Sequence, residues 1–163
     1  DIVARGDAAA ATVTAMQEIL VFGTSVELLG VAQAALDMTV GYTKLREQFG
    51  KLIGSFQALQ HRMVDCYVDA ELNRSLLFKV LSAWDEGTSH PAMVSAVKAR
   101  VGKGALKTVR AALQLHGAIG YTDEHDIGLY YTRAVPLAAT YGNEPTHVGL
   151  FPALPHPPPP PPG

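Results

Sequence analysis

The segment that decides the fold runs from Pro91 to His116 and reads PAMVSAVKARVGKGALKTVRAALQLH. Its apolar residues recur every three or four positions, which is the spacing of one helix face and not the alternation of a strand. Pro91 suits a first helical turn, and Gly117 directly after the segment is typical of a helix end. The segment therefore predicts a long helix with an apolar face made of Met93, Val94, Val97, Val101, Ala105, Val109, Ala112 and Leu113.

Two more helices are predicted before this segment, over residues 8–42 and 55–86. Ser55 suits the N-cap of the second, and Gly87 suits its left-handed end. Gly23 lies inside the first, where it either allows a close helix contact or marks a break. The expected apolar face of the first contains Met16, Ile19, Leu20, Val26, Leu29, Ala32, Ala35, Leu36 and Val40, and that of the second contains Phe56, Leu59, Met63, Cys66, Tyr67, Ala70, Leu77, Val80, Leu81 and Trp84.

A shorter helix is predicted after the central segment, from a cap at Thr122 or Asp123 to about Ala134. Pro136 is expected to prevent a longer one, because proline lacks the backbone N–H that a helix interior needs. No stretch shows the alternation of a strand, so no strand is predicted. Three long helices and a short one, joined by short loops, predict an all-α fold that is an antiparallel four-helix bundle.

The bulk composition is that of one folded domain. The chain has 163 residues, 48% hydrophobic and 17% charged, with a net charge of −2. We expect a helical domain over residues 1–151 and an extended proline-rich tail over residues 152–163. The start at Asp1 without a methionine suggests a piece of a longer polypeptide. Nothing in the charge balance favours nucleic acid, no stretch is read as a membrane span, and a cytoplasmic protein is expected.

Several kinds of site are not supported by the sequence. Glu124 and His125 are adjacent rather than three residues apart, so the spacing of a di-iron bundle is missing and no metal site is predicted. No glycine-flanked nucleophile elbow is present. The single cysteine, Cys66, lies in a helical apolar pattern and is expected to be a buried, unreactive thiol.

Two loops carry the residues that suit a ligand. Residues 46–57 bring a guanidinium, an aromatic ring, glycines and amides to one corner between helices. Residues 114–122 expose backbone at a helix end through glycines. Such a set suits a planar ligand that carries phosphate, because arginine binds phosphate in a bidentate manner. The alternative is a pair of ordinary interhelical turns with a capping glycine.

The order of these motifs resembles the C-terminal domain of the acyl-CoA dehydrogenases. The pattern is Tyr42-x-x-x-Arg46-x-Gln48-Phe49-Gly50-Lys51-x-Ile53, then Phe56-Gln57, Gln114-x-x-Gly117-x-x-Gly120-Tyr121 and Arg133. The resemblance covers roughly residues 26–141. It implies FAD as cofactor, an acyl-CoA substrate, an electron-transfer acceptor, and a dimer or larger oligomer whose flavin sites lie at subunit interfaces.

The same resemblance implies roles for individual residues. Arg46 would bind the FAD diphosphate, and Phe49 would line the adenine portion. Gln57 would contact the cofactor from the second helix, while the Gln114 loop would meet the FAD of a neighbouring subunit. The implied cofactor-binding set is Arg46, Gln48, Phe49, Ile53, Gln57, Gln114, Gly117 and Gly120. The loop departs from the family at Ala118, where a second glycine is usual and where the extra methyl group would lie close to the diphosphate.

The catalytic base that the family uses is absent from its usual positions. In the family a glutamate removes the proton alpha to the thioester while a hydride passes from the β-carbon to the flavin. The aligned residue after the fourth helix is Gly142, with Glu144 two residues later as the remaining candidate. The alternative position on the first helix holds Leu20, and Glu18 is about 200° away around that helix. We therefore expect a subunit or fragment whose base comes from a partner chain.

A second interpretation keeps the fold without the chemistry. In it the chain is a non-catalytic helical assembly module that has lost flavin binding. Ala118 and Gly142 favour this interpretation, whereas the joint presence of Arg46, Phe49 and Gln57 favours flavin binding.

Overall fold

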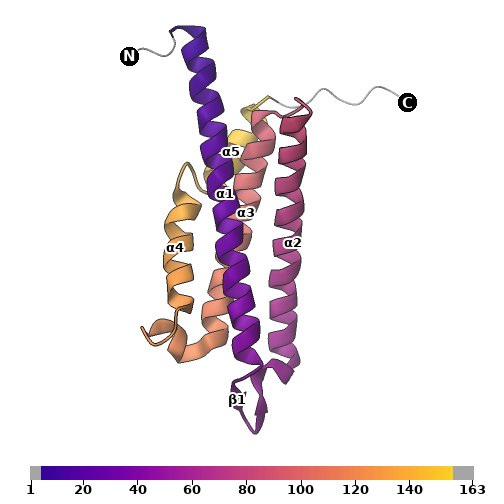
Figure 1. Cartoon of the computed structure of the whole chain (residues 1–163), viewed down its shortest axis with the longest axis vertical. Helices are drawn as coiled ribbons and strands as arrows, with labels where there is room; N and C mark the ends of the chain where they lie inside the picture. Colours follow the sequence, from indigo (N-terminus) through magenta and orange to yellow (C-terminus); the bar gives the residue numbers. More distant parts are fainter. Residues whose placement is uncertain (1–4, 156–163) are drawn as a thin grey trace, which may run out of the picture.

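The computed structural model describes residues 5–155, most of which are helical (Figure 1). Four helices run alternately up and down as an antiparallel bundle, which confirms the predicted fold, and a short fifth helix lies against the upper end of the central helix. The helices are α1 (Asp7–Thr43), α2 (Gln57–Asp85), α3 (Pro91–His116), α4 (Ile127–Ala139) and α5 (Glu144–Leu150). Three 3-10 turns cover Ile53–Ser55, Gly117–Tyr121 and Phe151–Ala153.

The central element is α3, which contacts all four other helices. Its predicted apolar face is buried: Val97 and Val101 have no exposed surface, and Met93 is partly buried at the rim. Burying one valine or leucine side chain stabilises a fold by about 1.5–3 kcal/mol. The periodicity of this one segment therefore locates the core of the bundle.

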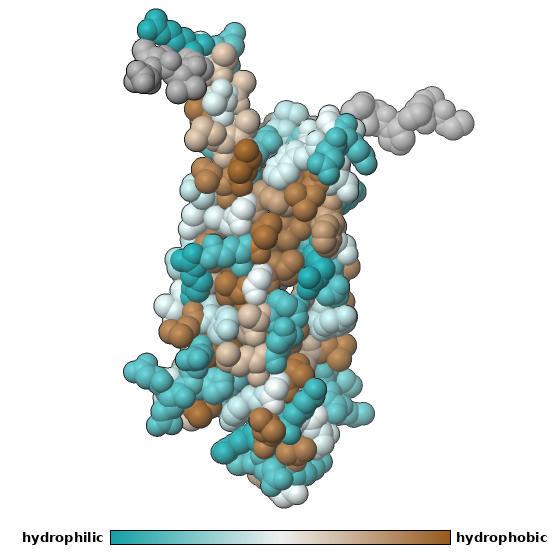
Figure 2. Space-filling model, in the orientation of Figure 1, coloured by the Kyte–Doolittle hydropathy of each residue, from teal (hydrophilic) through white to brown (hydrophobic). Residues whose placement is uncertain are grey.

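Only the lower part of α1 is embedded in the core. Leu29, Ala32, Ala35 and Leu36 are buried as predicted, but Met16, Ile19, Leu20 and Val26 are not, with 56% of Met16 and 63% of Ile19 exposed. The prediction of a continuous buried face was wrong. The N-terminal end of α1 extends past the other helices (Figure 1), and Val26, 46% exposed between the buried Ser25 and Leu28, lies off the packed face. Figure 2 shows hydrophobic residues gathered on the upper part of this face.

By length and composition alone α1 is also apolar enough to cross a membrane. Core helices of globular domains have the same properties, and the lower part of α1 is such a helix. The expectation that the chain has no membrane span stays a prediction.

The predicted ends of the long helices are largely confirmed. Gly87 and Gly117, directly after α2 and α3, have positive φ of 68° and 65°, which glycine adopts readily at a helix end, and α1 continues through Gly23 without a break. The predicted N-cap at Ser55 was wrong. Ser55 belongs to a 3-10 turn and its Oγ donates to the Leu52 carbonyl oxygen at 2.7 Å, so α2 begins two residues later, at Gln57.

A two-stranded hairpin that was not predicted joins α1 to α2. Strands β1 (Glu47–Gln48) and β2 (Lys51–Leu52) are antiparallel, with Gln48 opposite Lys51. Strands this short carry no detectable alternation, so the pattern cannot identify them. The 3-10 turn Ile53–Ser55, directly after the hairpin, packs tightly onto the end of α1: a Cβ on Gly54 would lie 2.8 Å from the carbonyl oxygen of Thr43.

The region after α3 departs most from the prediction. α4 begins at Ile127 and ends at Ala139, so it includes Pro136 and continues past the predicted end at Ala134. Proline removes one hydrogen bond without stopping the helix here, because α4 is held by its packing on α1 and α3. α5 was not predicted; Asn143 caps it by accepting from the backbone N–H of Thr146.

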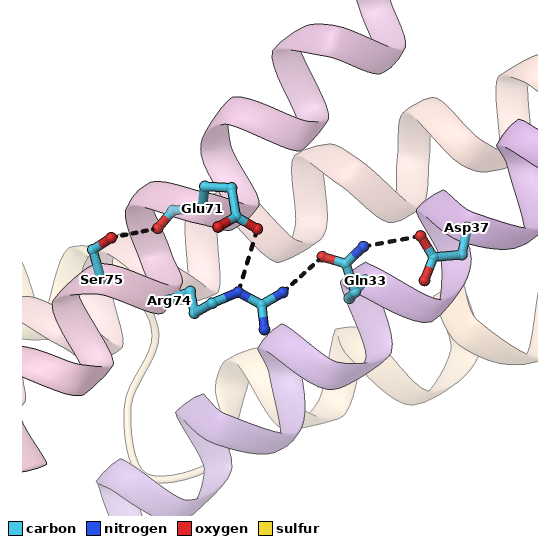
Figure 3. Close-up of polar contacts among 5 residues, drawn as sticks. All are labelled: Gln33, Asp37, Glu71, Arg74 and Ser75. Carbon is cyan, nitrogen blue, oxygen red and sulfur yellow. Dashed lines mark hydrogen bonds and ion pairs between the residues drawn. The ribbon is translucent and has the colours of Figure 1, made fainter.

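Polar side chains link the helices at the surface of the bundle. Arg74 of α2 donates to the Gln33 side-chain oxygen of α1 at 3.2 Å and to Glu71 within α2, as Figure 3 shows. Asp69 of α2 accepts from Arg100 and Lys107 of α3 at 2.6 and 2.7 Å. Beneath Asp69, Cys66 is buried as predicted, and burial raises the pKa of its thiol.

The predicted proline-rich tail falls mostly on residues 156–163, which lie outside the described residues. Its extended conformation and the division of the chain at residue 151 stay predictions.

Candidate functional site

Both loops that the sequence singled out lie at the lower end of the bundle and line one pocket. Because α1 and α3 both run downward, the hairpin after α1 and the turn after α3 meet there (Figure 1). The pocket has a volume of about 460 Å³, and we call it the loop pocket. It is lined by Tyr42, Arg46, Gln48, Ile53, Leu59, Arg62, Gln114, Leu115, His116, Gly117, Ala118 and Ile119.

The charged side chains that line the loop pocket are all positive. Arg46 from the hairpin and Arg62 from α2 line it, and no acidic residue does. Among the described residues, neither guanidinium makes an ion pair or a side-chain hydrogen bond within the chain. Unpaired arginines in a concave site without a carboxylate favour an anion, and their geometry suits phosphate.

His116 is one of the residues that line the pocket and is 3% exposed. Its ring stacks on Tyr42 at 4.4 Å between centroids and lies 4.5 Å from the ring of His125. Nδ1 donates to the carbonyl oxygen of Ala112 at 2.8 Å, because a carbonyl can only accept. Burial lowers the pKa of His116 and the neighbouring His125 lowers it further, while the hydrogen bond to the Ala112 carbonyl oxygen opposes that shift.

The structure separates the eight predicted cofactor-binding residues into two groups. Arg46, Gln48, Ile53, Gln114 and Gly117 line the loop pocket together. The other three do not line it.

Phe49 lies at the tip of the hairpin with 92% of its surface exposed and touches Phe56 edge to face. Gln57 is exposed on the first turn of α2. Gly120 is buried, and a Cβ there would lie 2.9 Å from the Leu113 carbonyl oxygen, so its small size serves helix packing.

Three polar lining residues, Tyr42, Arg62 and His116, were not assigned as site residues from the sequence. His116 lies in the sequence between two assigned residues, Gln114 and Gly117, and this position could have identified it as a lining residue. Arg62 follows Leu59 by three residues on α2, which puts both on the helix face that meets the end of α3.

The candidate base Glu144 lies at the opposite end of the bundle and is paired. Its carboxylate accepts from Lys103 at 2.8 Å on an exposed surface. Gly142, at the usual position of the base, has φ of 102°, and a Cβ there would lie 2.9 Å from Nε2 of His147. A glutamate at this position is therefore incompatible with the present turn between α4 and α5.

Buried polar groups close to this turn satisfy one another. His147 donates from Nε2 to the Tyr141 carbonyl oxygen at 3.0 Å and accepts at Nδ1 from the Ser95 hydroxyl at 2.9 Å. Lys98, 1% exposed, donates to the Leu137 carbonyl oxygen at 2.8 Å and to Thr24 at 3.3 Å. We call Ser95, Lys98, Glu144 and His147 the upper network.

Glu18 lies beside the upper network, in a small pocket that Ser95 and His147 also line. Burial raises the pKa of its carboxyl, while His90 opposes that shift. Leu20, the residue at the alternative base position, is half-exposed. Within residues 5–155 no group of three or more histidine, cysteine or acidic side chains is arranged to hold a metal ion.

Comparison with known proteins identifies the family. The model of the acyl-CoA dehydrogenase C-terminal domain matches residues 11–150, nearly the whole described chain. The chain belongs to the acyl-CoA dehydrogenase family. This confirms the family inferred from the motifs and the fold inferred from the helix pattern.

Two curated relatives show how much of a complete protein the chain represents. Acyl-CoA dehydrogenase IpdE2 of Mycolicibacterium smegmatis is 44% identical over 110 residues, 66% of this chain and 33% of that protein. The 3-sulfinopropanoyl-CoA desulfinase of Paraburkholderia xenovorans is 39% identical over 101 residues, 61% of this chain and 25% of that protein. The chain thus spans about a third or less of the length of these relatives.

Solved structures agree with the fold. The glutaryl-coenzyme A dehydrogenase complex with glutaryl-CoA superposes with a TM-score of 0.83 at 28% identity, covering 87% of this chain and 36% of that one. Butyryl-CoA dehydrogenase from Megasphaera elsdenii gives a TM-score of 0.82 at 24% identity, covering 86% and 37%.

Proposed function

We propose that this chain is the FAD-binding helical part of an acyl-CoA dehydrogenase that catalyses α,β-dehydrogenation of an acyl-CoA thioester, and that its catalytic base comes from a partner chain. The observation that carries the proposal is the loop pocket, where Arg46 and Arg62 line one cavity without a carboxylate to neutralise them. Two free guanidinium groups fit the diphosphate of a dinucleotide.

The residues of the pocket divide the binding task. Arg46 and Arg62 neutralise the diphosphate, and the turn at Gly117 brings backbone close to it. The side-chain amides of Gln48 and Gln114 provide hydrogen-bonding groups at the rim. FAD, when bound, accepts the hydride that leaves the β-carbon of the substrate.

A single ligand accounts for both loops. The resemblance alone implied that the hairpin serves one flavin and the Gln114 loop serves that of a neighbouring subunit. Because Arg46 and Gln114 line the same cavity, we propose that both loops bind the same FAD. The rest of that FAD and the acyl chain then contact other parts of an oligomeric assembly, since this chain spans only a third of its relatives.

The missing base supports a division of labour between chains. Glu144 is held by Lys103, and Gly142 cannot become a glutamate in its present turn. We propose that a partner chain removes the α-proton and that electrons leave through an electron-transfer acceptor. The cytoplasm is the proposed location.

The test is a visible absorption spectrum of the chain assembled with its native companion chains, before and after anaerobic addition of mixed acyl-CoAs. A flavin spectrum that bleaches on addition is expected, and Arg46→Ala in the same complex is expected to release flavin. An intact wild-type complex without flavin would favour the alternative, a helical assembly module that has lost its cofactor.

A further inference from the structure

One side of α2 is exposed and rich in large apolar side chains. α2 packs mainly on α3 and α1 and forms an outer edge of the bundle (Figure 1). Along its free side Tyr67 is 55% exposed, Val68 49%, Leu72 55% and Phe78 62%. Tyr67 was predicted on the buried face of this helix. A row of exposed apolar residues on one helix is unusual for a monomer and marks an interaction surface.

Two charged residues flank this row, one toward each end of α2. Asp65 lies in the lower half and Lys79 in the upper half, and both are exposed. Among the described residues neither makes an ion pair or a side-chain hydrogen bond. Between them, Glu71 pairs with Arg74 within α2, and Asp69 pairs with α3. Asp65 and Lys79 are therefore the charges of this side that a partner can neutralise.

These residues are arranged symmetrically about the middle of the helix. Asp65 and Lys79 are about four helical turns apart, so both lie on the same side of α2. Tyr67 and Phe78 are about three turns apart, so they also share a side. Both pairs have their midpoint beside Leu72. We call the set the free face of α2; it consists of Asp65, Tyr67, Val68, Leu72, Phe78 and Lys79.

The symmetry of the free face fits a second copy of the same chain. In a two-fold contact, a residue that meets a second residue of the copy is matched by the reciprocal pair. An axis at Leu72, perpendicular to α2, makes two α2 helices antiparallel and keeps each side of the helix against the same side of its copy. Asp65 then meets Lys79 of the second copy, Tyr67 meets Phe78, and Leu72 meets Leu72.

We propose that the free face of α2 binds the free face of a second copy of this chain, with the helices antiparallel about a two-fold axis at Leu72. Charge complementarity favours this occupant, because opposite charges equally far from one apolar residue pair twice in a self-contact. The contact also removes large apolar side chains from water in both copies. None of the six residues lines the loop pocket, so the contact does not depend on FAD binding.

Charge reversal tests the occupant and the register together. Asp65→Lys alone, or Lys79→Glu alone, places like charges opposite each other at both symmetric contacts. Asp65→Lys combined with Lys79→Glu restores opposite charges if the two positions meet across copies of this chain. Glu124→Lys is the matched control, because Glu124 is exposed in the loop before α4, outside the free face.

The experiment measures self-association of the full chain by sedimentation velocity over a range of concentrations. Wild type and Glu124→Lys are expected to dimerise equally. Each single reversal is expected to weaken the dimer about tenfold or more, and the double reversal to return to within about threefold of wild type. A monomeric wild type, single reversals without effect, or a double reversal as weak as the single ones would overturn the proposal.

A second arm uses the complex assembled with its native companion chains. Native mass spectrometry counts the copies of this chain, and two are expected in wild type, one in Asp65→Lys and two again in the double reversal. Loss of a companion chain instead of the second copy in Asp65→Lys would show that a different protein covers the free face, and would overturn the proposal. Flavin content is measured in the same samples: two copies without flavin would support this contact while the proposed function fails.

Discussion

The two ends of the bundle contain polar groups of opposite character. At the lower end, the side chains of Arg46 and Arg62, which line the loop pocket, and the buried Nε2 of His116 have no partner within the described chain. In the upper network Lys98, His147 and Glu144 are each paired through hydrogen bonds or an ion pair. Unpaired groups held in a cavity are ready for a ligand, whereas paired ones fix the packing of helices. We propose from this difference that the lower end binds a ligand and that the upper network holds the helices together.

The largest effect is expected from removing both free guanidinium groups. Arg46→Ala with Arg62→Ala should cost about 3 kcal/mol or more of FAD binding, over a hundredfold, because each charged hydrogen bond contributes about 1.5–3 kcal/mol. Equilibrium titration of flavin in the assembled complex measures it. Arg74→Ala is the matched control, since Arg74 contacts Glu71 and Gln33 outside the pocket. If Arg74→Ala weakened FAD binding as much as the double variant, the effect would not come from the charges in the loop pocket.

The next effect concerns Lys98. Burial lowers the pKa of its side chain to about 8. Between that value and the ordinary value of about 10.4 the unfolded chain binds more protons than the folded one, so stability rises with pH across this window. Relative to Lys98→Met, wild type should gain about 2–3 kcal/mol between pH 8 and pH 10.5. Urea unfolding at three pH values tests this. If the free energy of unfolding changed with pH equally in wild type and Lys98→Met, Lys98 would not be desolvated in the folded state.

A smaller effect is expected at the turn before α5. Gly142→Ala should destabilise the chain by about 1–3 kcal/mol, because its φ of 102° is strained for any other residue and the new methyl group would meet His147. Gly149→Ala is the control: nothing lies near its Cβ position, and it is inside a helix. Thermal unfolding compares the two. An equal melting temperature for both would remove the structural objection to a glutamate at this position.

The smallest effect is expected at Glu144. Glu144→Gln breaks an exposed ion pair with Lys103, and such pairs contribute about 0.2–1 kcal/mol. Dehydrogenase activity of the assembled complex should stay within about twofold of wild type, because the proposed base belongs to the partner chain. A loss of activity by orders of magnitude with flavin still bound would make Glu144 the base and contradict that assignment.

The prediction of the helices succeeded where a long periodic segment is buried and failed where the local signal is short or misleading. The repeat of α3 indicates both its bounds and its buried face. Pro136 indicated a helix end, but packing on α1 and α3 continues α4 beyond it. The hairpin of Glu47–Gln48 and Lys51–Leu52 is too short for any periodicity to appear.

The residues of the candidate site were also predicted only in part. Arg46 and Gln114 were identified because the motif places them in loops, and both line the pocket. Phe49 has a positive φ of 54° and lies at the exposed tip of the hairpin, outside the pocket, so its contact with the cofactor stays a prediction. Arg62 was missed because the sequence of α2 does not show that the end of α3 lies next to this residue.

The sequence by itself determined the family, the helical class, the buried face of α3 and the absence of a glutamate at position 142, because these depend on residue identity and spacing along the chain. Only the tertiary structure decided that two loops far apart in sequence share one cavity, that Glu144 is paired with Lys103, and that Nε2 of His116 has no donor. Whether a polar group is satisfied depends on neighbours from other helices. No pattern along one segment contains that information, because the close packing of the bundle creates those contacts.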